Sequence, residues 1–212
     1  INYQLKNARA LSGKNQKIFF KDINDFVIGV DEVGRGALSG PVVSCGVLLK
    51  KEILNSHLIE EINDSKKLSP KKREILSVFI KENSFYSFGL ANNKEIDQIN
   101  ILNATIISMK RALEKFENYN NKIKIDGQKI FDYNQQTFFV KKGDSSSVSI
   151  ASASILAKTF RDKLMCEYAT NYPIYNWDKN KGYGTKKHFL AIKRYGLSPL
   201  HRKSFLKNII KQ

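Results

Sequence analysis

The fold of this chain is decided by residues 29–36, which read Gly29-Val30-Asp31-Glu32-Val33-Gly34-Arg35-Gly36. An apolar, β-rich run from Phe26 to Asp31 ends there at two acids and a glycine turn, and a second apolar run resumes from Pro41 to Leu49. This pattern predicts two strands joined by a turn. Carboxylates at the end of a buried strand are costly unless a positive charge neutralises them, and a metal ion would do so.

Two more acids fall at comparable places further along the chain. Asp126 ends a short apolar run and precedes Gly127, and taken alone it is best explained by an ordinary Asp-Gly turn. Asp144 stands just before a helix-like segment, where an N-cap is as good an explanation as a functional role. Together the four acids favour a common site, because an α/β sheet gathers its ligand crevice where its strands end. Carboxylate oxygens suit Mg²⁺ or Mn²⁺, and two such ions can promote phosphodiester hydrolysis.

The remaining pattern alternates apolar runs with amphipathic stretches. The predicted helices begin at Ser69-Pro70, run from Asn93 to about Phe116, and run from Ser147 to about Tyr168. Further strands are predicted over Ser84 to about Leu90, Lys122 to Asp126 and Thr137 to Lys141, and the section Lys179–Gln212 holds at least one helix. The first three strands should pair antiparallel, and a strand that follows a long helix can return parallel. The expected fold class is α/β, with a mixed five-stranded sheet flanked by helices and a C-terminal helical extension.

The charge of the chain indicates the kind of partner. Its 36 Lys and Arg exceed its 20 Asp and Glu, leaving a formal net charge of +16. Such a surface attracts polyanions and gains affinity by releasing phosphate counterions, so a nucleic acid is the expected partner. No stretch approaches the ~20 apolar residues of a membrane span, and we expect a soluble, cytoplasmic protein with no membrane contact. Because the chain opens on Ile1, a trimmed or partial N-terminus is expected.

The cysteines and histidines are not expected to carry chemistry. Cys45 and Cys166 lie far apart without CxxC spacing and are expected to be buried, inert thiols. The three histidines, His57, His188 and His201, lie in polar stretches and are expected at the surface.

Two glycine-containing segments point to a nucleic-acid substrate. The turn Gly34-Arg35-Gly36 leaves backbone amides unshielded, and its backbone could hydrogen-bond a 2′-hydroxyl, the group that separates RNA from DNA. It is not a nucleotide-binding P-loop, because the required Lys and Ser/Thr are missing. Tyr183, between two glycines, is placed to stack on a nucleotide, although an ordinary loop aromatic is an equally good interpretation.

Five blocks, in order along the chain, resemble ribonuclease HII, the type 2 ribonuclease H family. They are Gly29 to Gly36, Asn63-Asp64-Ser65-Lys66-Lys67-Leu68-Ser69, Ile125-Asp126-Gly127, Lys142-Gly143-Asp144-Ser145 with Ala153 to Asp162, and Lys181-Gly182-Tyr183-Gly184-Thr185 with His201-Arg202-Lys203-Ser204-Phe205. The resemblance covers about residues 27 to 206 and implies a ribonuclease H-like fold. Two positions depart from the family pattern: Ala37 stands where a proline often follows the turn, and Asn180 where a histidine often precedes Lys-Gly-Tyr.

The resemblance also implies the roles of individual residues. The catalytic, metal-binding carboxylates would be Asp31, Glu32, Asp126 and Asp144, with Mg²⁺ or Mn²⁺ as cofactor. Gly34, Arg35 and Gly36 would read the ribonucleotide at an RNA-to-DNA junction, and Tyr183 would stack on the following deoxyribose. Lys66 would hold a backbone phosphate. Lys158 and Arg161 would line the substrate groove, although Lys158 and Asp162 could simply form a solvated helix pair.

The implied activity is that of a metal-dependent endonuclease. It would hydrolyse the RNA strand of RNA/DNA hybrids and incise 5′ of ribonucleotides embedded in duplex DNA, leaving 3′-hydroxyl and 5′-phosphate ends. The expected organisation is an N-terminal arm over 1–26, a catalytic domain over 27–176, and a basic helical segment over 177–212 that completes the substrate groove. We expect a monomer, and the tail Leu206–Gln212 supports no replication-clamp contact by any recognisable motif.

Two other functions compete with this one. A non-catalytic basic nucleic-acid-binding protein would show salt-sensitive binding without cleavage, but four acids in one site would repel phosphate unless metal were present. Another nuclease or transferase on the same sheet, such as an integrase-like enzyme, would lack the Gly-Arg-Gly turn and the Tyr183 loop.

Overall fold

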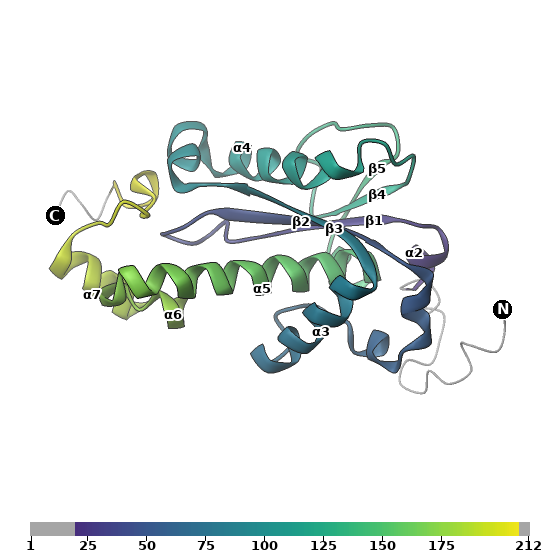
Figure 1. Ribbon diagram of the computed structural model, residues 1–212. Coiled ribbons are helices and arrows are strands. Elements are labelled where there is room, and N and C mark those ends of the chain that lie inside the picture. The colour runs from purple at the N-terminus through teal and green to yellow at the C-terminus, as the bar shows by residue number, and fades with distance from the viewer. Residues whose placement is uncertain (1–19, 208–212) are drawn as a thin grey trace.

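The structure is a computed structural model that describes residues 20–207. A single twisted sheet lies between α4 on one face and α3 and α5 on the other, and the C-terminal helices α6 and α7 extend beyond one end of it (Figure 1). The strands are β1 Ile28–Val33, β2 Val42–Leu49, β3 Ser84–Ala91, β4 Ile123–Asp126 and β5 Thr137–Val140. The α-helices are α2 Lys21–Asn24, α3 Pro70–Glu82, α4 Asn93–Leu113, α5 Val148–Asn171, α6 Trp177–Asn180 and α7 Lys186–Tyr195. Short 3₁₀ turns are η2 Lys51–Asn55, η3 His57–Glu61, η4 Glu114–Phe116, η5 Gly143–Ser145, η6 Pro173–Tyr175 and η7 Lys203–Phe205.

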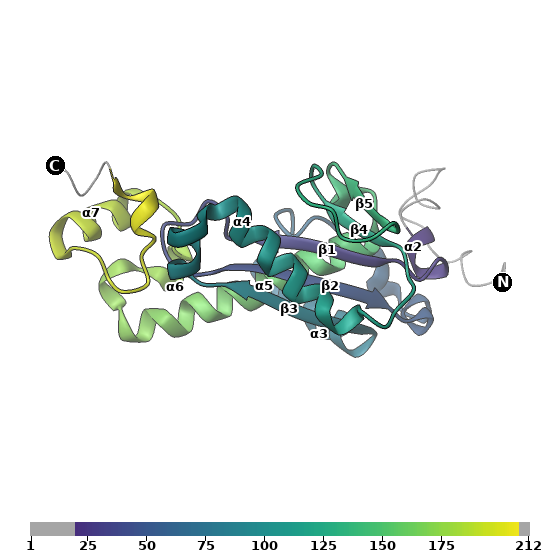
Figure 2. The same ribbon diagram turned by 90° about the horizontal axis from the view of Figure 1, so that it is seen from above.

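The sheet has five strands in the order β3-β2-β1-β4-β5, which confirms the predicted mixed α/β class. β2 pairs antiparallel with both β1 and β3, whereas β4 pairs parallel with β1 and with β5. The antiparallel β2–β3 pair was expected from a connection without a helix, but α3 lies between these strands. The pairing holds because α3 folds back under the sheet, next to α5, and returns the chain beside β2 (Figure 2).

Helix α5 lies against the centre of the sheet because the facing residues are small. Ala151, Ala153 and Ala157 of this helix are fully buried. At the point of closest approach, a Cβ added to Gly29 of β1 would lie 2.1 Å from the carbonyl carbon of Ser149. Only a glycine therefore lets the start of α5 rest on β1, beside the two acids that follow on this strand.

The helices α3 and α5 begin at the predicted residues, whereas α4 contains a break that was not predicted. Ser69 accepts from the amide of Lys72 at the start of α3, and Ser147 caps α5 in the same way. The long helix predicted from Asn93 is broken at Asn100, where φ is 65° and ψ is 167°. The Asn100 side chain accepts from the amide of Asn103, so it restarts the helix as a new cap.

Phe20, Asp22 and Ile23, which the sequence assigned to an N-terminal arm, are buried. Phe20 and Ile23 pack in the same apolar cluster as the inner face of α5. Asp22 is 1% exposed, accepts from Lys124 Nζ at 2.6 Å and also bonds the hydroxyl of Ser147. The rest of the predicted arm, residues 1–19, lies outside the described residues.

The segment after residue 176 packs on the rest of the fold through its own apolar cluster. Trp177, Ile192 and Leu206 from this segment gather with Leu38 of the β1–β2 loop and Met165 of α5. Its helices therefore lie against the loop that carries the Gly-Arg-Gly turn, at the end of the sheet where β1 finishes (Figure 2).

Candidate active site

The two strand-end acids of the central strands lie side by side. β1 and β4 are paired as far as Val30 and Ile125, and Asp31 and Asp126 each follow one residue later. β1 continues through Glu32 to Val33, so the strand does not stop at the acids as the sequence suggested. Asp126 Oδ1 accepts from the backbone N–H of Gly143 at 2.6 Å, which brings the η5 turn and its Asp144 to the end of β4.

The charges of the four acids act on one another. Burial, the Glu32 charge and the Asp126 charge raise the pKa of Asp31 well above its usual value, against hydrogen bonds from Ser154 and the Glu32 amide. Burial raises the pKa of Glu32, and Asp126 adds to this while Arg35 opposes it. The pKa of Asp144 is also raised, by burial, then by Asp64 and Asp126. The charge of Asp126 thus contributes to all three shifts, so Asp126 lies within electrostatic reach of the other three acids.

The basic side chains of the protein do not neutralise all of these carboxylates. Glu32 has an ion pair with Arg35 at 3.3 Å, while Asp31 is 7% exposed without a salt bridge among residues 20–207. Within that same range, no three His, Cys, Asp or Glu side chains are gathered closely enough to hold an ion as they stand. The donor set still fits Mg²⁺ or Mn²⁺, because carboxylates that raise one another's pKa lose this repulsion when a cation lies between them.

The Asn63–Ser69 block borders the acids. The carboxylate of Asp64 accepts from the backbone N–H of Lys66 at 2.9 Å, and Lys66 is exposed. Lys66 and Lys67 both lower the pKa of Asp144, so their charges lie on the same side of the site. The buried hydroxyl of Ser65 is 2.9 Å from that of Ser154, which in turn bonds Asp31.

The conformation of the Gly34-Arg35-Gly36 turn requires a glycine at position 34. Gly34 has a φ of +93°, and a Cβ placed there would lie 2.2 Å from Arg161 Nε. Arg35 and Gly36 are exposed at the tip of the turn. The amide of Ala37 donates to the Gly34 carbonyl at 3.3 Å, so the family's usual proline at this position would remove a hydrogen bond that closes the turn.

The Tyr183 loop docks directly on this turn. The amide of Leu38 donates to the Gly182 carbonyl at 2.8 Å, and the Tyr183 amide donates to the Asn180 carbonyl at 2.9 Å. Asn180, the second departure from the family pattern, accepts from the Gly182 amide through its side chain at 2.8 Å. Lys158 Nζ lies 5.9 Å from the centre of the Tyr183 ring. Turn, tyrosine and lysine therefore form one surface.

Arg161 is buried and does not line a surface, contrary to the prediction. It was expected to line the substrate groove, but it is 0% exposed and its guanidinium donates to three backbone carbonyls. The acceptors are Pro41 at 2.9 Å, Lys181 at 2.8 Å and Ser39 at 3.0 Å. It lies beneath the turn, 5.4 Å from the Tyr183 ring, and ties the two loops together. Lys158 forms an ion pair with Asp162 of the same helix at 2.7 Å, which was the alternative to a role in the substrate groove.

The prediction of a surface position was also wrong for two of the three histidines. His57 is exposed as expected, but His188 and His201 are 0% and 1% exposed and hydrogen-bond to each other. Cys45 is buried as expected. Cys166 is only partly buried, and its sulfur lies 3.1 Å from Lys181 Nζ.

The sequence also missed Arg202. This second buried guanidinium donates to the Gly40 carbonyl at 2.9 Å and to the Arg35 carbonyl at 2.9 Å. Burial, with the nearby Arg161 charge, lowers its pKa to about 9. Arg202 lies in the His201–Phe205 block, so its place in the resemblance was the available signal, but nothing local indicated burial.

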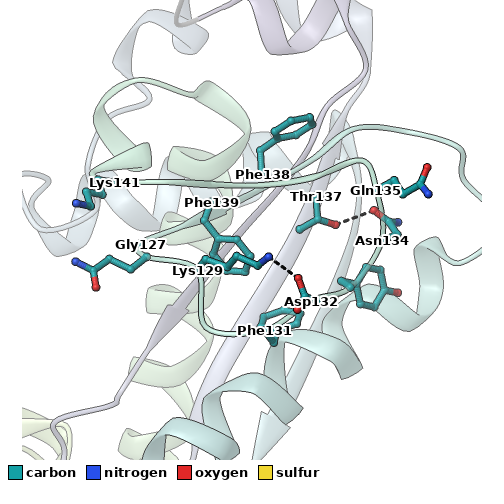
Figure 3. Close-up of a pocket in the computed structure, with 12 residues that line it drawn as sticks. Gly127, Lys129, Phe131, Asp132, Asn134, Gln135, Thr137, Phe138, Phe139 and Lys141 are labelled. Carbon is teal, nitrogen blue, oxygen red and sulfur yellow. Dashed lines mark hydrogen bonds and ion pairs between the residues drawn. The ribbon is translucent and has the colours of Figure 1, made fainter.

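A cavity of about 770 Å³ lies beside the site without containing it. It is formed by the β4–β5 loop and β5, and Gly127 links it to the end of β4. In Figure 3 Lys129 and Asp132 point toward each other, next to the rings of Phe131 and Phe139. None of the four predicted carboxylates lines this cavity.

The model of the family described as Ribonuclease HII matches residues 28–208. The chain belongs to the ribonuclease HII family. A ribonuclease HII of Caldanaerobacter subterraneus subsp. tengcongensis is 46% identical over 212 residues, covering 100% of this chain and 86% of that protein. A ribonuclease HII of Caldicellulosiruptor saccharolyticus is 48% identical over 187 residues, covering 88% and 89%. The family assignment makes this protein a ribonuclease H, a hydrolase that acts on RNA/DNA substrates.

Solved structures share the fold of this ribonuclease HII. The PCNA:RNase HII complex from Archaeoglobus fulgidus superposes with a TM-score of 0.73 at 18% identity, covering 88% of this chain and 97% of that one. Bst-RNase HIII in complex with Mn²⁺ gives a TM-score of 0.67 at 16% identity, covering 86% and 65%. Over the described part of the chain, no helix is long and apolar enough to cross a membrane.

Proposed function

We propose that this ribonuclease HII hydrolyses the RNA strand of RNA/DNA hybrids and incises 5′ of single ribonucleotides in duplex DNA. The observation that carries the proposal is the contact between Leu38 and Gly182, which joins the Gly-Arg-Gly turn to the Tyr183 loop at the end of β1. The turn proposed to read the ribose is thereby joined to the tyrosine proposed to stack, and its Arg35 pairs with Glu32 at 3.3 Å. Such an arrangement can test two consecutive sugars, one with a 2′-hydroxyl and one without.

The proposed residues divide the work. Asp31, Glu32, Asp126 and Asp144 hold Mg²⁺ or Mn²⁺, which when bound would activate a water and stabilise the leaving oxygen. The turn residues Gly34, Arg35 and Gly36 contact the ribonucleotide, and Tyr183 stacks on the sugar that follows. Lys66 binds a backbone phosphate, and Lys158 adds positive charge beside the tyrosine. The buried Arg161 acts through the loops that it ties together.

The bond changes follow from the polarity of the proposed cut. Water attacks the phosphorus 5′ of the ribonucleotide, and the bond from phosphorus to the 3′-oxygen of the preceding nucleotide breaks. That oxygen takes a proton and becomes a 3′-hydroxyl, while the attacking oxygen stays on the 5′-phosphate. The acids keep this site negative until a cation binds, so substrate phosphate is repelled without metal and accepted with it.

The test compares three duplexes of one sequence: all DNA, DNA with one ribonucleotide, and an RNA/DNA hybrid. With Mg²⁺ or Mn²⁺ we expect cleavage of the second and third and none of the first. Asp126→Asn should abolish cleavage, whereas Asp25→Asn, the same change at a partly exposed acid before β1, should leave it intact. Cleavage in chelator, cleavage of all-DNA duplex, or an active Asp126→Asn would refute the proposal.

A contact with a replication clamp is not part of the proposal. The Archaeoglobus fulgidus neighbour was solved as a complex with PCNA, which is a statement about that protein. In this chain residues 208–212 of the tail lie outside the described residues.

A further inference from the structure

The two buried histidines have defined proton positions. His188 Nδ1 is 2.9 Å from the Tyr183 carbonyl, which only accepts, so Nδ1 carries the proton. His188 Nε2 must then accept, and it lies 3.1 Å from the indole N–H of Trp177, which only donates. It is also 3.1 Å from His201 Nε2, which is therefore the protonated nitrogen of that ring. His201 Nδ1 accepts from the Ser198 amide at 2.9 Å, consistent with this assignment.

The pair connects the two loops that face the substrate. On one side His188 holds the carbonyl of Tyr183. On the other, His201 forms an isolated antiparallel bridge with Ser39, and the next residue, Arg202, donates its amide to the Leu38 carbonyl at 2.8 Å. Ser39 Oγ also lies 3.5 Å from His188 Nε2. The two rings therefore add a connection between the Tyr183 backbone and the loop after the turn, beside the direct Leu38–Gly182 hydrogen bond and the contacts of Arg161.

We propose that His188 and His201 are positioning residues that set the spacing between the Tyr183 ring and the Gly34–Gly36 turn. The inference rests on the proposed function, in which these two loops contact consecutive sugars. A duplex with one ribonucleotide offers a single productive register, so it depends on that spacing. A continuous hybrid offers a ribose at every position of one strand, so it depends on it less.

Two substitutions of His188 separate the halves of its role. His188→Asn keeps a side-chain N–H near the Nδ1 position, which can still donate to the Tyr183 carbonyl, and loses the acceptor for Trp177 and His201. His188→Gln keeps an acceptor near the Nε2 position and loses the donor to Tyr183. Each leaves a buried polar group unpaired, so both should lower the melting temperature to a similar degree.

The experiment measures kcat and KM for both variants and wild type on the single-ribonucleotide duplex and on the hybrid, below the lowest melting temperature of the set. We expect His188→Gln to raise KM for the single-ribonucleotide duplex about 10-fold, as for one lost hydrogen bond, with kcat nearly unchanged and a smaller effect on the hybrid. His188→Asn breaks the other half of the connection, to His201, and should also raise KM more for the single-ribonucleotide duplex than for the hybrid.

The outcomes separate this inference from the proposed function. A wild-type enzyme that does not cut the single-ribonucleotide duplex overturns the proposed function, and this inference with it. A wild-type enzyme that cuts it, together with a His188→Gln variant that matches it, overturns the inference alone. Equal losses on both substrates that follow melting temperature would also overturn it, since a purely structural role predicts that result.

Discussion

Replacing Gly34 with alanine should destabilise the protein strongly, although the change adds one methyl group. The backbone at Gly34 has a φ of +93°, and a side chain in such a sparsely populated region costs about 1–3 kcal/mol. The new Cβ would also lie 2.2 Å from Arg161 Nε, so the guanidinium must move. Arg161 is fully buried and bonds three carbonyls, and leaving one of them unpaired costs about 1–3 kcal/mol.

The two contributions add to about 4 kcal/mol, near the middle of their combined range. For a domain of this size that corresponds to a fall in melting temperature of roughly 8–16 °C. The matched control is Gly36→Ala in the same turn, where an added Cβ meets nothing within 4 Å and φ is not in the positive region. This control should change stability by no more than about 0.5 kcal/mol.

The assay is urea denaturation followed by circular dichroism, with thermal melts in parallel. Chelator is present throughout, so that metal binding does not contribute. A Gly34→Ala protein that unfolds within about 1 kcal/mol of the Gly36→Ala protein would refute the reasoning, because strain and displacement of Arg161 would then both be absent.

Three further predictions concern buried charges. Asp31→Asn should abolish cleavage and raise the melting temperature in chelator at neutral pH. Because the pKa of Asp31 is raised in the folded state, the protein loses stability as the pH rises through that pKa, and the neutral amide avoids this loss. A lower melting temperature than wild type would contradict it. The pKa of His201 is lowered from 6.5 to about 4, so the folded state binds fewer protons than the unfolded state in that window. This contribution to stability should be complete above pH 6.5 and fall toward pH 4. Urea melts at several pH values should therefore show a smaller fall in the free energy of unfolding between pH 6.5 and pH 4 for His201→Gln than for wild type; an equal fall would count against this. Asp22→Ala should cost about 3 kcal/mol by leaving Lys124 and Ser147 without their buried partner, whereas the exposed-site control Asp25→Ala should cost less than about 0.5 kcal/mol in the same unfolding assay.

The parts of the fold that the sequence predicted are those with local causes. The strand end at Asp126 and the helix start at Ser69 depend on neighbours a few positions away, and both are confirmed. The mixed five-stranded sheet was predicted from the same patterns, whereas the order of its strands was not. The break at Asn100 was missed because the apolar period continues across it.

The residues misread from the sequence are polar groups buried by distant partners. Arg161 bonds Pro41 across 120 positions, and a histidine or arginine with such a partner looks locally like a surface residue. His188 and His201 were assigned to the surface for that reason, although each fills a buried polar position against the other. The four acids were predicted from strand ends and a helix start, whereas the contacts between the loops that border them required the three-dimensional structure.

The hydrogen bond between Arg202 and the Arg35 carbonyl, 167 positions apart, also constrains the order in which the molecule is completed. All four acids have been synthesised by residue 144, well before the ribosome adds the residues that hold the glycine turn. A chain that ends early therefore carries all four proposed metal ligands without the brace for the loop that is proposed to read the sugar. With the proposed roles, the growing chain completes its hydrolytic centre first and the support for its selectivity afterwards.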